Sequence, residues 1–461
     1  MFSDEDTITA IATPIGQAGI GIVRISGPRS RKIAEKIFRP KRPIQGLISH
    51  RLYLGHLYDP SSESMIDEVL LSFMEAPHSY TREDVVEVNS HSGYLLLSRI
   101  LQIILDQGAR LARPGEFTLR AFVNGRIDLT QAEAVIDLIN AKSDRGLVLA
   151  SQQIHGSFKQ QIEVLRQNAL DILAHAEVAI DFPEEETSIM YREEAADHIR
   201  EEVINPIETS IATHARNRIW VDGVSTVIVG RVNAGKSSLL NRLLNEQRAI
   251  VTPIPGTTRD IIESTITVEG VPLRLMDTAG LREVKDEVER IGVYLTEQKL
   301  SEADFLLIVI DQSRPLNQDD LNIIGQSRGK KALIVINKID LRSQLDEETS
   351  LRAFSGFPKV KISALTGEGL DHLRTAIVRC VLESDIDMTS SHAVSNLRHR
   401  QALMEAARFF KDAEQSMRGD SPMEIVALEI KSGLDALGEI IGETGNEEVL
   451  DRIFSQFCLG K

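Results

Sequence analysis

The spacing of hydrophobic residues changes along the chain and divides it into four stretches. Before about residue 120, short apolar runs rich in β-branched residues alternate with helical spacing, which predicts a β-rich domain with interspersed helices. From Leu129 to Trp220 apolar positions recur every three or four residues, which indicates long helices with a break at Gly156. In the first stretch we expect strands at 20–25, 69–73 and 85–88 and helices at 30–38 and 94–105.

The first long helix has a start signal in the sequence. Thr130 and Glu133 have the spacing of a capping box, in which each side chain accepts a hydrogen bond from the other residue's backbone N–H. We therefore expect Thr130 to cap this helix. The acidic segment 181–186 contains a proline, and we expect it to be a solvated loop.

Strand and helix signals alternate from residue 224 to about 382, which predicts a mostly parallel sheet with helices on both faces. Helical spacing then returns. This pattern indicates an α/β domain inserted into one helical domain, although a separate C-terminal bundle also fits. The predicted segments are 1–120, 121–223, 224–382 and 383–461, in a multidomain fold of the α/β and α+β classes. Within the third, we expect strands at 226–230, 273–276, 305–311 and 333–337 and a helix at 237–244.

Composition restricts the classes of function. The chain has 461 residues, a formal net charge of −16 and two cysteines, Cys380 and Cys458. Two distant cysteines exclude a disulfide framework and a cysteine-based zinc site, and they suit a reducing cytoplasm. We expect no signal peptide, and no apolar run approaches the ~20 residues of a membrane span. The acidic charge argues against indiscriminate nucleic-acid binding, so an RNA partner needs a local basic surface.

A phosphate-binding loop follows the first strand of the α/β segment. The residues Gly230–Ser237 match G-x-x-x-x-G-K-[ST] in full, between an apolar run and an apolar helix start. Glycines let the backbone wrap a phosphate closely, so that successive N–H groups point at the anion. We expect Lys236 to reach the β- and γ-phosphates and the Ser237 hydroxyl to bind Mg²⁺.

Four further elements follow in order and predict guanine specificity. The segment Asp277–Gly280 fits D-x-x-G, whose aspartate holds Mg²⁺ through water and whose glycine N–H contacts the γ-phosphate. The segment Asn337–Asp340 fits N-K-x-D, in which the aspartate accepts from the ring N–H and the amino group of guanine. The segment Ser363–Leu365 fits a loop whose backbone N–H recognises the guanine carbonyl. In the loop 252–260, Thr258 is a second Mg²⁺ ligand that senses the γ-phosphate.

These five elements define the predicted GTP contacts. They are Asn233, Ala234, Gly235, Lys236, Ser237, Ser238, Thr252, Pro253, Ile254, Pro255, Gly256, Thr257, Thr258, Asp277, Thr278, Ala279, Gly280, Asn337, Lys338, Asp340, Ser363, Ala364 and Leu365. The preference for GTP over ATP rests on Asp340.

The position after D-x-x-G lacks the catalytic side chain that such motifs usually include. Ras-like proteins place there a glutamine that orients the attacking water, whereas this chain has Leu281, which carries no polar side-chain atom. The transition state still requires a positioned water and added positive charge. Polar residues of 282–290, an arginine from a partner or a metal cation are the alternatives.

The chain resembles the MnmE (TrmE) family of tRNA-modifying GTPases over essentially its whole length. The resemblance rests on the segments 6–27, 113–139, GRVNAGKSSLLN, TPIPGTTRD, DTAGLREVKDEVERIG and the final FCLGK. It implies a folate-binding N-terminal domain, a helical domain and an inserted Ras-like domain, in a homodimer formed through the N-terminal domains.

The resemblance also implies an activity and its partners. Hydrolysis of GTP would be activated by K⁺ when two GTPase domains meet, and Glu289 matches the family's water-orienting acid. The reaction would add an aminomethyl or carboxymethylaminomethyl group at carbon 5 of the wobble uridine of certain tRNAs, with an FAD-dependent MnmG (GidA)-type partner. The one-carbon unit would come from methylene- or formyl-tetrahydrofolate. By motif position, K⁺ would be held by Asn233, Thr252, Ile254 and Thr257, and folate by Arg24, Glu87, Arg126 and Lys461.

Several assignments have a structural alternative. Glu289 can equally be an exposed helix residue that pairs with Lys285. Position 126 is often lysine in the family, and arginine keeps the charge but changes the geometry. His91 is expected to be structural, Cys458 is either functional or simply a reduced thiol, and Arg259 is either a dimer contact or a surface charge.

A second class of function shares the same GTPase motifs. A GTPase switch in RNA or ribosome assembly, without group-transfer chemistry, would also carry Leu281. The N-terminal segment separates the two readings, because residues 1–120 have 14 basic and 14 acidic side chains and are therefore neutral, unlike a basic RNA-binding domain. A dimerisation platform that binds no folate is a third reading of that segment.

Overall fold

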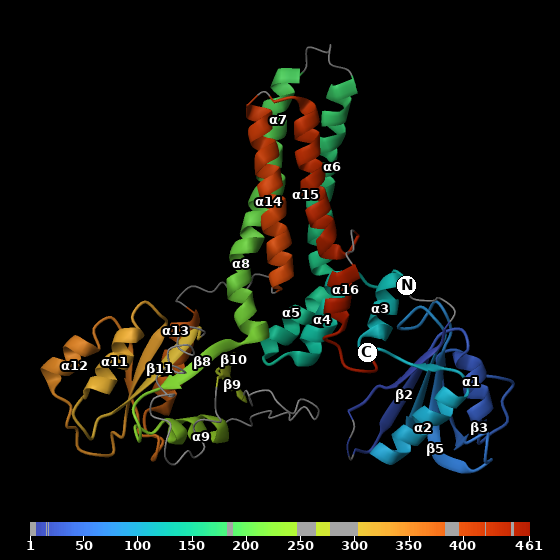
Figure 1. Cartoon of the computed structure of the whole chain (residues 1–461), viewed down its shortest axis with the longest axis horizontal. Coiled ribbons are helices and arrows are strands. Elements are labelled where there is room, and N and C mark those ends of the chain that lie inside the picture. Colours follow the sequence, from blue (N-terminus) through green and yellow to red (C-terminus); the bar gives the residue numbers. More distant parts are fainter. Residues whose placement is uncertain are drawn as a thin grey trace. The chain divides into compact units, whose positions relative to one another are not determined.

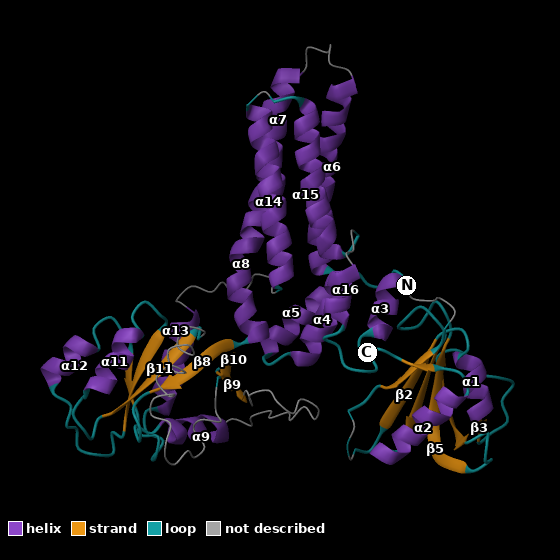
Figure 2. Ribbon diagram, in the orientation of Figure 1, coloured by secondary structure: helices purple, strands orange, loops and turns teal. Residues whose placement is uncertain are grey.

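The computed structural model describes residues 6–461 except 15, 17, 182–187, 247–263, 277–302, 383–395, 420 and 444–446. Two sheets and a set of long helices make up the described part (Figures 1 and 2). The chain divides into two compact units, one of Met1–Ile136, Gln153–Arg200 and Arg408–Lys461 and the other of Asp137–Gln152 and Glu201–Ala407. None of the described helices is both long and apolar enough to cross a bilayer.

The N-terminal sheet has seven strands in the order β3-β4-β5-β6-β2-β1-β7, and every pair is antiparallel except β1 with β7. The helices α1 (Ser30–Ile37) and α2 (Tyr94–Asp106) pack against apolar side chains such as Val23, Leu71 and Val88. The expected strands and helices of this segment are therefore confirmed. The strands are β1 (Ile8–Ile11), β2 (Gly21–Ser26), β3 (Phe38–Pro40), β4 (Arg51–Tyr58), β5 (Met65–Met74), β6 (Val85–Ser90) and β7 (Arg110–Leu111).

The other face of this sheet carries polar and exposed side chains, because strand residues alternate between faces. Arg24 on β2 lies directly opposite Glu87 on β6, one residue out of phase with the buried Val23 and Val88. Strand alternation thus places two of the four predicted folate residues, Arg24 and Glu87, side by side on the face away from α1 and α2.

Helices make up most of the chain between the two sheets and after the second sheet (Figure 2). The helix α15 packs along α6, and their buried positions recur at helical spacing. A short π-helical turn, Arg200–Ile204, precedes α8 and was not expected. The helices are α3 (Glu116–Val123), α4 (Leu129–Asn140), α5 (Asp144–Ile154), α6 (Ser157–Asp181), α7 (Ser188–Ile199), α8 (Asn205–Asp222), α14 (Leu397–Arg418), α15 (Met423–Ile441) and α16 (Glu447–Phe454).

The expected cap of α4 is wrong by two residues. Asp128 Oδ1 accepts from the backbone N–H of Thr130 (2.8 Å) and Gln131 (3.0 Å), and Gln131 Oε1 accepts from the N–H of Asp128 (3.0 Å). The capping box is therefore Asp128 with Gln131. The Thr130 hydroxyl instead donates to Asp128 (2.6 Å), because Thr130 already lies inside the first turn. The break at Gly156 is confirmed, since α5 ends at Ile154 and Gly156 has φ +85°.

The second sheet has six strands in the order β13-β12-β11-β8-β10-β9, and only β9 runs antiparallel to its neighbour. Separate apolar clusters lie on its two faces, as expected for a sheet covered by helices on both sides. The strands are β8 (Val224–Val229), β9 (Ser264–Val268), β10 (Val271–Leu275), β11 (Phe305–Asp311), β12 (Ala332–Asn337) and β13 (Lys359–Lys361), and the helices are α9 (Lys236–Glu246), α11 (Gln318–Gln326), α12 (Glu347–Ala353) and α13 (Leu370–Leu382).

Candidate nucleotide and N-terminal sites

The phosphate-binding loop connects the carboxyl end of β8 to α9, at the edge of the sheet where ligands of such folds bind. Gly230 has φ +149° and Gly235 has φ +98°, conformations that favour glycine. A Cβ on Gly230 would meet the Val309 carbonyl, and one on Gly235 would meet the Asn337 amide. Both glycines are therefore required for the loop to lie this close to the neighbouring strands.

Lys236 is held against the loop by two carbonyl groups. Its Nζ donates to the oxygens of Gly230 (2.7 Å) and Arg231 (2.8 Å), and burial lowers its pKa. A partly buried ammonium beside the N-terminus of α9 suits a phosphate group, which would compensate the partial burial of the charge. Asn233 has φ +63°, a conformation that asparagine tolerates better than most residues.

Asn337 joins three motifs that are far apart in the sequence. It is 2% exposed, and its Nδ2 donates to the Ala234 carbonyl in the phosphate loop (2.9 Å). The backbone N–H of Ala364 donates to its Oδ1 (3.0 Å), and the Ser363 hydroxyl donates to Asp340 Oδ1 (2.6 Å). The predicted phosphate and base contacts are thus adjacent in the described structure.

Asp311 is a charged residue near this site that the motifs do not include. It ends β11, and its Oδ2 lies 2.7 Å from the Nζ of Lys338 in the N-K-x-D segment. The available sequence signal is an acidic residue at the end of the otherwise apolar strand FLLIVID. The predicted switch and water-orienting residues lie outside the described residues: Thr252, Pro253, Ile254, Pro255, Gly256, Thr257, Thr258, Asp277, Thr278, Ala279, Gly280, Leu281 and Glu289.

A second polar cluster lies on the open face of the N-terminal sheet, around Arg24. Its guanidinium pairs with Glu87 (2.9 Å) and donates to the Gly460 carbonyl (3.1 Å). Gly460 has φ +95°, and a Cβ there would meet the backbone of Ile11 and Ala12. The C-terminal segment therefore packs against β1 with glycine required at position 460, which brings Lys461 near Arg24.

Tyr80 is an aromatic residue of this cluster that sequence reasoning missed. The centroid of its ring lies 5.7 Å from the guanidinium of Arg24 and 4.8 Å from that of Arg126, and Arg24 is also 5.6 Å from the Phe117 ring. The Tyr80 hydroxyl is hydrogen-bonded to Thr118 (2.9 Å), and Arg126 donates to the Tyr80 carbonyl (3.1 Å). A single tyrosine in a turn gives no sequence signal for this position.

The cluster carries more positive than negative charge. Burial, with repulsion from Arg24 second, lowers the pKa of Lys461. Arg24, Arg126 and Lys461 face one acidic member, Glu87, beside two aromatic rings. This combination suits an anionic ligand with a flat ring system. The structure thus brings all four predicted folate residues near one another.

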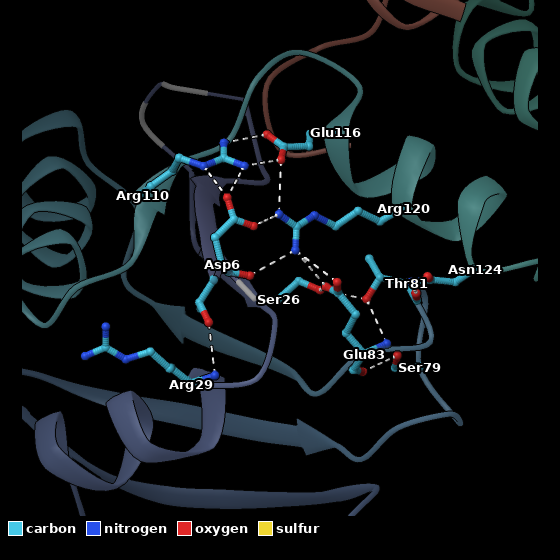
Figure 3. Close-up of polar contacts among 11 residues, drawn as sticks. Asp6, Ser26, Arg29, Ser79, Thr81, Glu83, Arg110, Glu116, Arg120 and Asn124 are labelled. Carbon is cyan, nitrogen blue, oxygen red and sulfur yellow. Dashed lines mark hydrogen bonds and ion pairs between the residues drawn. The ribbon is translucent and has the colours of Figure 1, made fainter. Parts of the chain in front are cut away.

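A partly buried charge network around Arg120 links the start of α3 to the residues before β1 (Figure 3). Arg120 donates to Asp6 (2.5 Å), Glu83 (2.9 Å) and Glu116 (3.1 Å), and Arg110 also bonds both Asp6 (2.6 Å) and Glu116 (2.5 Å). Burial opposes the ionisation of Asp6 and Glu116, but hydrogen bonds from the arginines outweigh it and lower both pKa values. The network holds α3, and with it Phe117 and Thr118, against β1.

His91 and Cys458 are two residues outside these clusters that the sequence analysis considered. His91 is bound to Asp67 through its ring nitrogen (2.8 Å) and its backbone N–H (2.9 Å). This double contact agrees with the structural role expected for His91. Cys458 is an exposed free thiol.

Comparison with known proteins covers nearly the whole chain. Residues 7–126 match the model for the GTP-binding protein TrmE N-terminus, and residues 129–458 match the model for the MnmE helical domain. The chain is 45% identical to tRNA modification GTPase MnmE of Geobacillus kaustophilus, over 99% of each protein. It is also 45% identical to tRNA modification GTPase MnmE of Bacillus subtilis, over 99% of this chain and 100% of that protein.

One solved structure is similar to part of this chain. A variant of Era from Aquifex aeolicus bound to GDP·AlF4⁻ is 28% identical over 40% of this chain and 66% of that chain, with a TM-score of 0.26, a value that adds nothing to the identification. The identification rests instead on full-length relatives and on two adjoining family models. Together with the phosphate and guanine motifs gathered at one edge of the second sheet, they show that this chain belongs to the MnmE family of tRNA modification GTPases.

Proposed function

We propose that this GTPase is activated by K⁺ and acts in the cytoplasm as a homodimer with an FAD-dependent MnmG-type partner. The proposed product carries an aminomethyl or carboxymethylaminomethyl group at carbon 5 of the wobble uridine of certain tRNAs. The observation that carries the proposal is the excess of positive charge around Tyr80 in the N-terminal domain, which suits a tetrahydrofolate derivative. When bound, that derivative would supply the one-carbon unit.

The proposed nucleotide contacts are those that the motifs predict, and the loop geometry supports them. Lys236 binds the phosphates, Asp340 reads the guanine ring N–H and amino group, and the Ala364 region binds the guanine carbonyl. Asn337 holds these parts in register through its bonds to Ala234 and Ala364. Ser237 and Thr258 are the proposed Mg²⁺ ligands, and Mg²⁺ would neutralise charge on the β- and γ-phosphates.

The proposed K⁺ site would supply the positive charge that Leu281 does not. Asn233, Thr252, Ile254 and Thr257 are its proposed ligands, and the backbone conformation of Asn233 fits a residue held for a specific contact. We expect GTP hydrolysis to be faster in KCl than in NaCl at equal ionic strength. Equal rates in the two salts would rule out the potassium site.

Glu289 is the proposed water-orienting residue and gives a second test of the GTPase mechanism. In saturating K⁺, we expect Glu289→Ala to slow hydrolysis by about 10²-fold, as loss of a positioning acid does. Affinity for GDP should be nearly unchanged, because the acid would act on the water. A matching loss of GDP affinity would show that Glu289 is structural.

The proposed folate site uses the chemistry of its side chains. Arg24, Arg126 and Lys461 can bind the glutamate carboxylates, Glu87 can accept from N–H groups of the pterin, and the Tyr80 ring can stack on a planar group. The pair Arg24–Glu87, at 2.9 Å, keeps both side chains aimed across the same face of the sheet.

Titration of the full-length dimer with methylene-tetrahydrofolate tests this site. We expect saturable binding that weakens by about tenfold or more in Gly460→Ala, because a Cβ there displaces the C-terminal segment. The control Gly93→Ala has no atom within 4 Å of the added Cβ and should bind normally. Absence of binding to the unmodified protein would instead favour a GTPase switch in RNA or ribosome assembly.

A further inference from the structure

Asp311 is a buried carboxylate at the end of β11 that belongs to none of the nucleotide motifs. Its side chain is 2% exposed. Ser313 donates to Oδ1 from its backbone N–H (2.9 Å) and its hydroxyl (2.6 Å), which leaves Oδ2 directed at two cations. Burial raises the pKa of Asp311, but hydrogen bonds from Lys338 and Ser313 outweigh burial, so the pKa lies below its ordinary value. The carboxylate is therefore charged at neutral pH.

The two cations belong to different halves of the nucleotide site. Lys338 Nζ, from the N-K-x-D segment, lies 2.7 Å from Oδ2, and the guanidinium of Arg231, from the phosphate loop, lies 4.0 Å from the same oxygen. The backbone carbonyl of Arg231 in turn accepts from Lys236. One carboxylate oxygen thus faces the side chain of a residue from each loop.

The order of the strands explains why Asp311 lies near both the phosphate loop and the N-K-x-D segment. β11 lies between β8, which leads into the phosphate loop, and β12, which leads into the N-K-x-D segment. Because the three strands are parallel, their carboxyl ends meet at one edge, and the last residue of the middle strand stands between the two loops. Lys338 also has φ +67°, a strained conformation for lysine that an anchored side chain helps to hold.

We propose that Asp311 is a positioning residue that couples the phosphate loop to guanine recognition through a shared ion pair with Arg231 and Lys338. The proposal rests on the guanine-nucleotide site described above. A change at Arg231 then alters the position of Lys338 and the adjacent Asp340, although Arg231 itself belongs to the phosphate loop. This link is electrostatic and separate from the hydrogen bonds of Asn337.

Competition binding of GDP and IDP to the full-length protein tests the coupling. The hypoxanthine base of IDP lacks the amino group that donates a hydrogen bond to Asp340 in the proposed site, so the ratio of the GDP and IDP affinities reports on base recognition alone. We expect Arg231→Met to lower the preference for GDP over IDP by about threefold or more, and Asp311→Asn to lower it further. The matched control is Asp320→Asn, because Asp320 lies 3.6 Å from Nη1 of Arg231, whereas Asp311 faces Nη2 and also pairs with Lys338. This control should leave the ratio within about twofold.

The possible results distinguish a failure of the coupling through Asp311 from a failure of the proposed guanine site itself. If the unmodified protein does not prefer GDP to IDP, the guanine site itself is wrong. If it does, but Arg231→Met weakens GDP and IDP equally, the coupling through Asp311 is wrong. If Asp311→Asn does not fold, the double variant Arg231→Met with Lys338→Met replaces it, and additive effects on the ratio would overturn the proposal.

Discussion

Arg120 shows how strongly a single side chain of the N-terminal domain depends on its partners. Its side chain is 8% exposed and contacts three carboxylates, of Asp6, Glu83 and Glu116. A charge buried to this degree is tolerated only when paired, and removal of one partner leaves the others buried without compensation. The lowered pKa values of Asp6 and Glu116 mean that the folded state favours their ionised forms.

We predict that Arg120→Met destabilises the N-terminal domain by about 3 kcal/mol at pH 7. In the unmodified protein, carboxylates with lowered pKa contribute stability above their unfolded pKa of about 4, and this contribution is lost as pH falls through the folded pKa. In the variant, the buried carboxylate of Glu116 has lost one of its arginine partners, so protonation removes an uncompensated charge and stabilises the folded state. The difference in free energy of unfolding between the unmodified protein and Arg120→Met should therefore become smaller as pH falls from 7 to 4.

Hydrogen exchange of the amides in β1 measures this local stability at each pH. The control is Arg31→Met, which removes an exposed pair with Glu35 on α1 and should cost less than about 0.5 kcal/mol after solvent screening. A gap between Arg120→Met and the unmodified protein that stays constant from pH 7 to 4 would contradict the electrostatic account.

The close packing of α14 and α15 depends on a residue without a side chain. Gly433 on α15 is buried, and a Cβ there would lie 2.7 Å from ring atoms of Phe410 on α14, which is itself fully buried. The ring has no free space into which to move, because buried cores are close-packed. The contact between α14 and α15 thus requires glycine at this position.

We predict that Gly433→Ala lowers the stability of this helix pair by about 1–3 kcal/mol, through overpacking that exceeds the gain in helix propensity. The matched control is Gly325→Ala on α11, where no atom lies within 4 Å of the added Cβ, and this change should stabilise by up to about 1 kcal/mol. Thermal unfolding followed by circular dichroism distinguishes them, and equal shifts in the same direction would refute the packing argument.

The open face of the N-terminal sheet carries exposed leucines on two neighbouring strands. Leu52 is 60% exposed and Leu54 44% on β4, and Leu70 opposite Leu54 on β5 is 38% exposed. Apolar side chains gathered on one open sheet face are typical of an association surface. We propose this face as part of the homodimer contact.

We predict that Leu52→Glu with Leu54→Glu converts the proposed homodimer to a monomer, because two charges would have to be buried in the proposed contact. Light scattering should then give a mass near 51.2 kDa in place of twice that value. The control Leu428→Glu changes an equally exposed leucine on α15, 65% exposed, and should remain dimeric. A double variant that keeps the mass of the unmodified protein would exclude this face.

The elements and the chemistry of the motifs could be predicted because both depend on local sequence. The strand predicted at 305–311 is β11 as observed. Its six apolar residues are bounded by polar segments, and a run this short favours a buried strand over a helix. The cap of α4 was missed because Asp128 and Thr130 both suit a cap, and the backbone geometry selected Asp128. The switch residues and Glu289 lie outside the described residues and stay predictions.

Local sequence was enough to predict many of the strands and helices and the candidate phosphate loop, because periodicity and glycine spacing act over a few residues. The distant residues that meet could be identified only once the chain was folded. Gly460 contacts Arg24 across 436 positions, the Tyr80 ring lies near two arginines, and Asp311 faces both nucleotide loops. Such contacts follow from strand order and chain packing, which bring together residues that no local pattern connects.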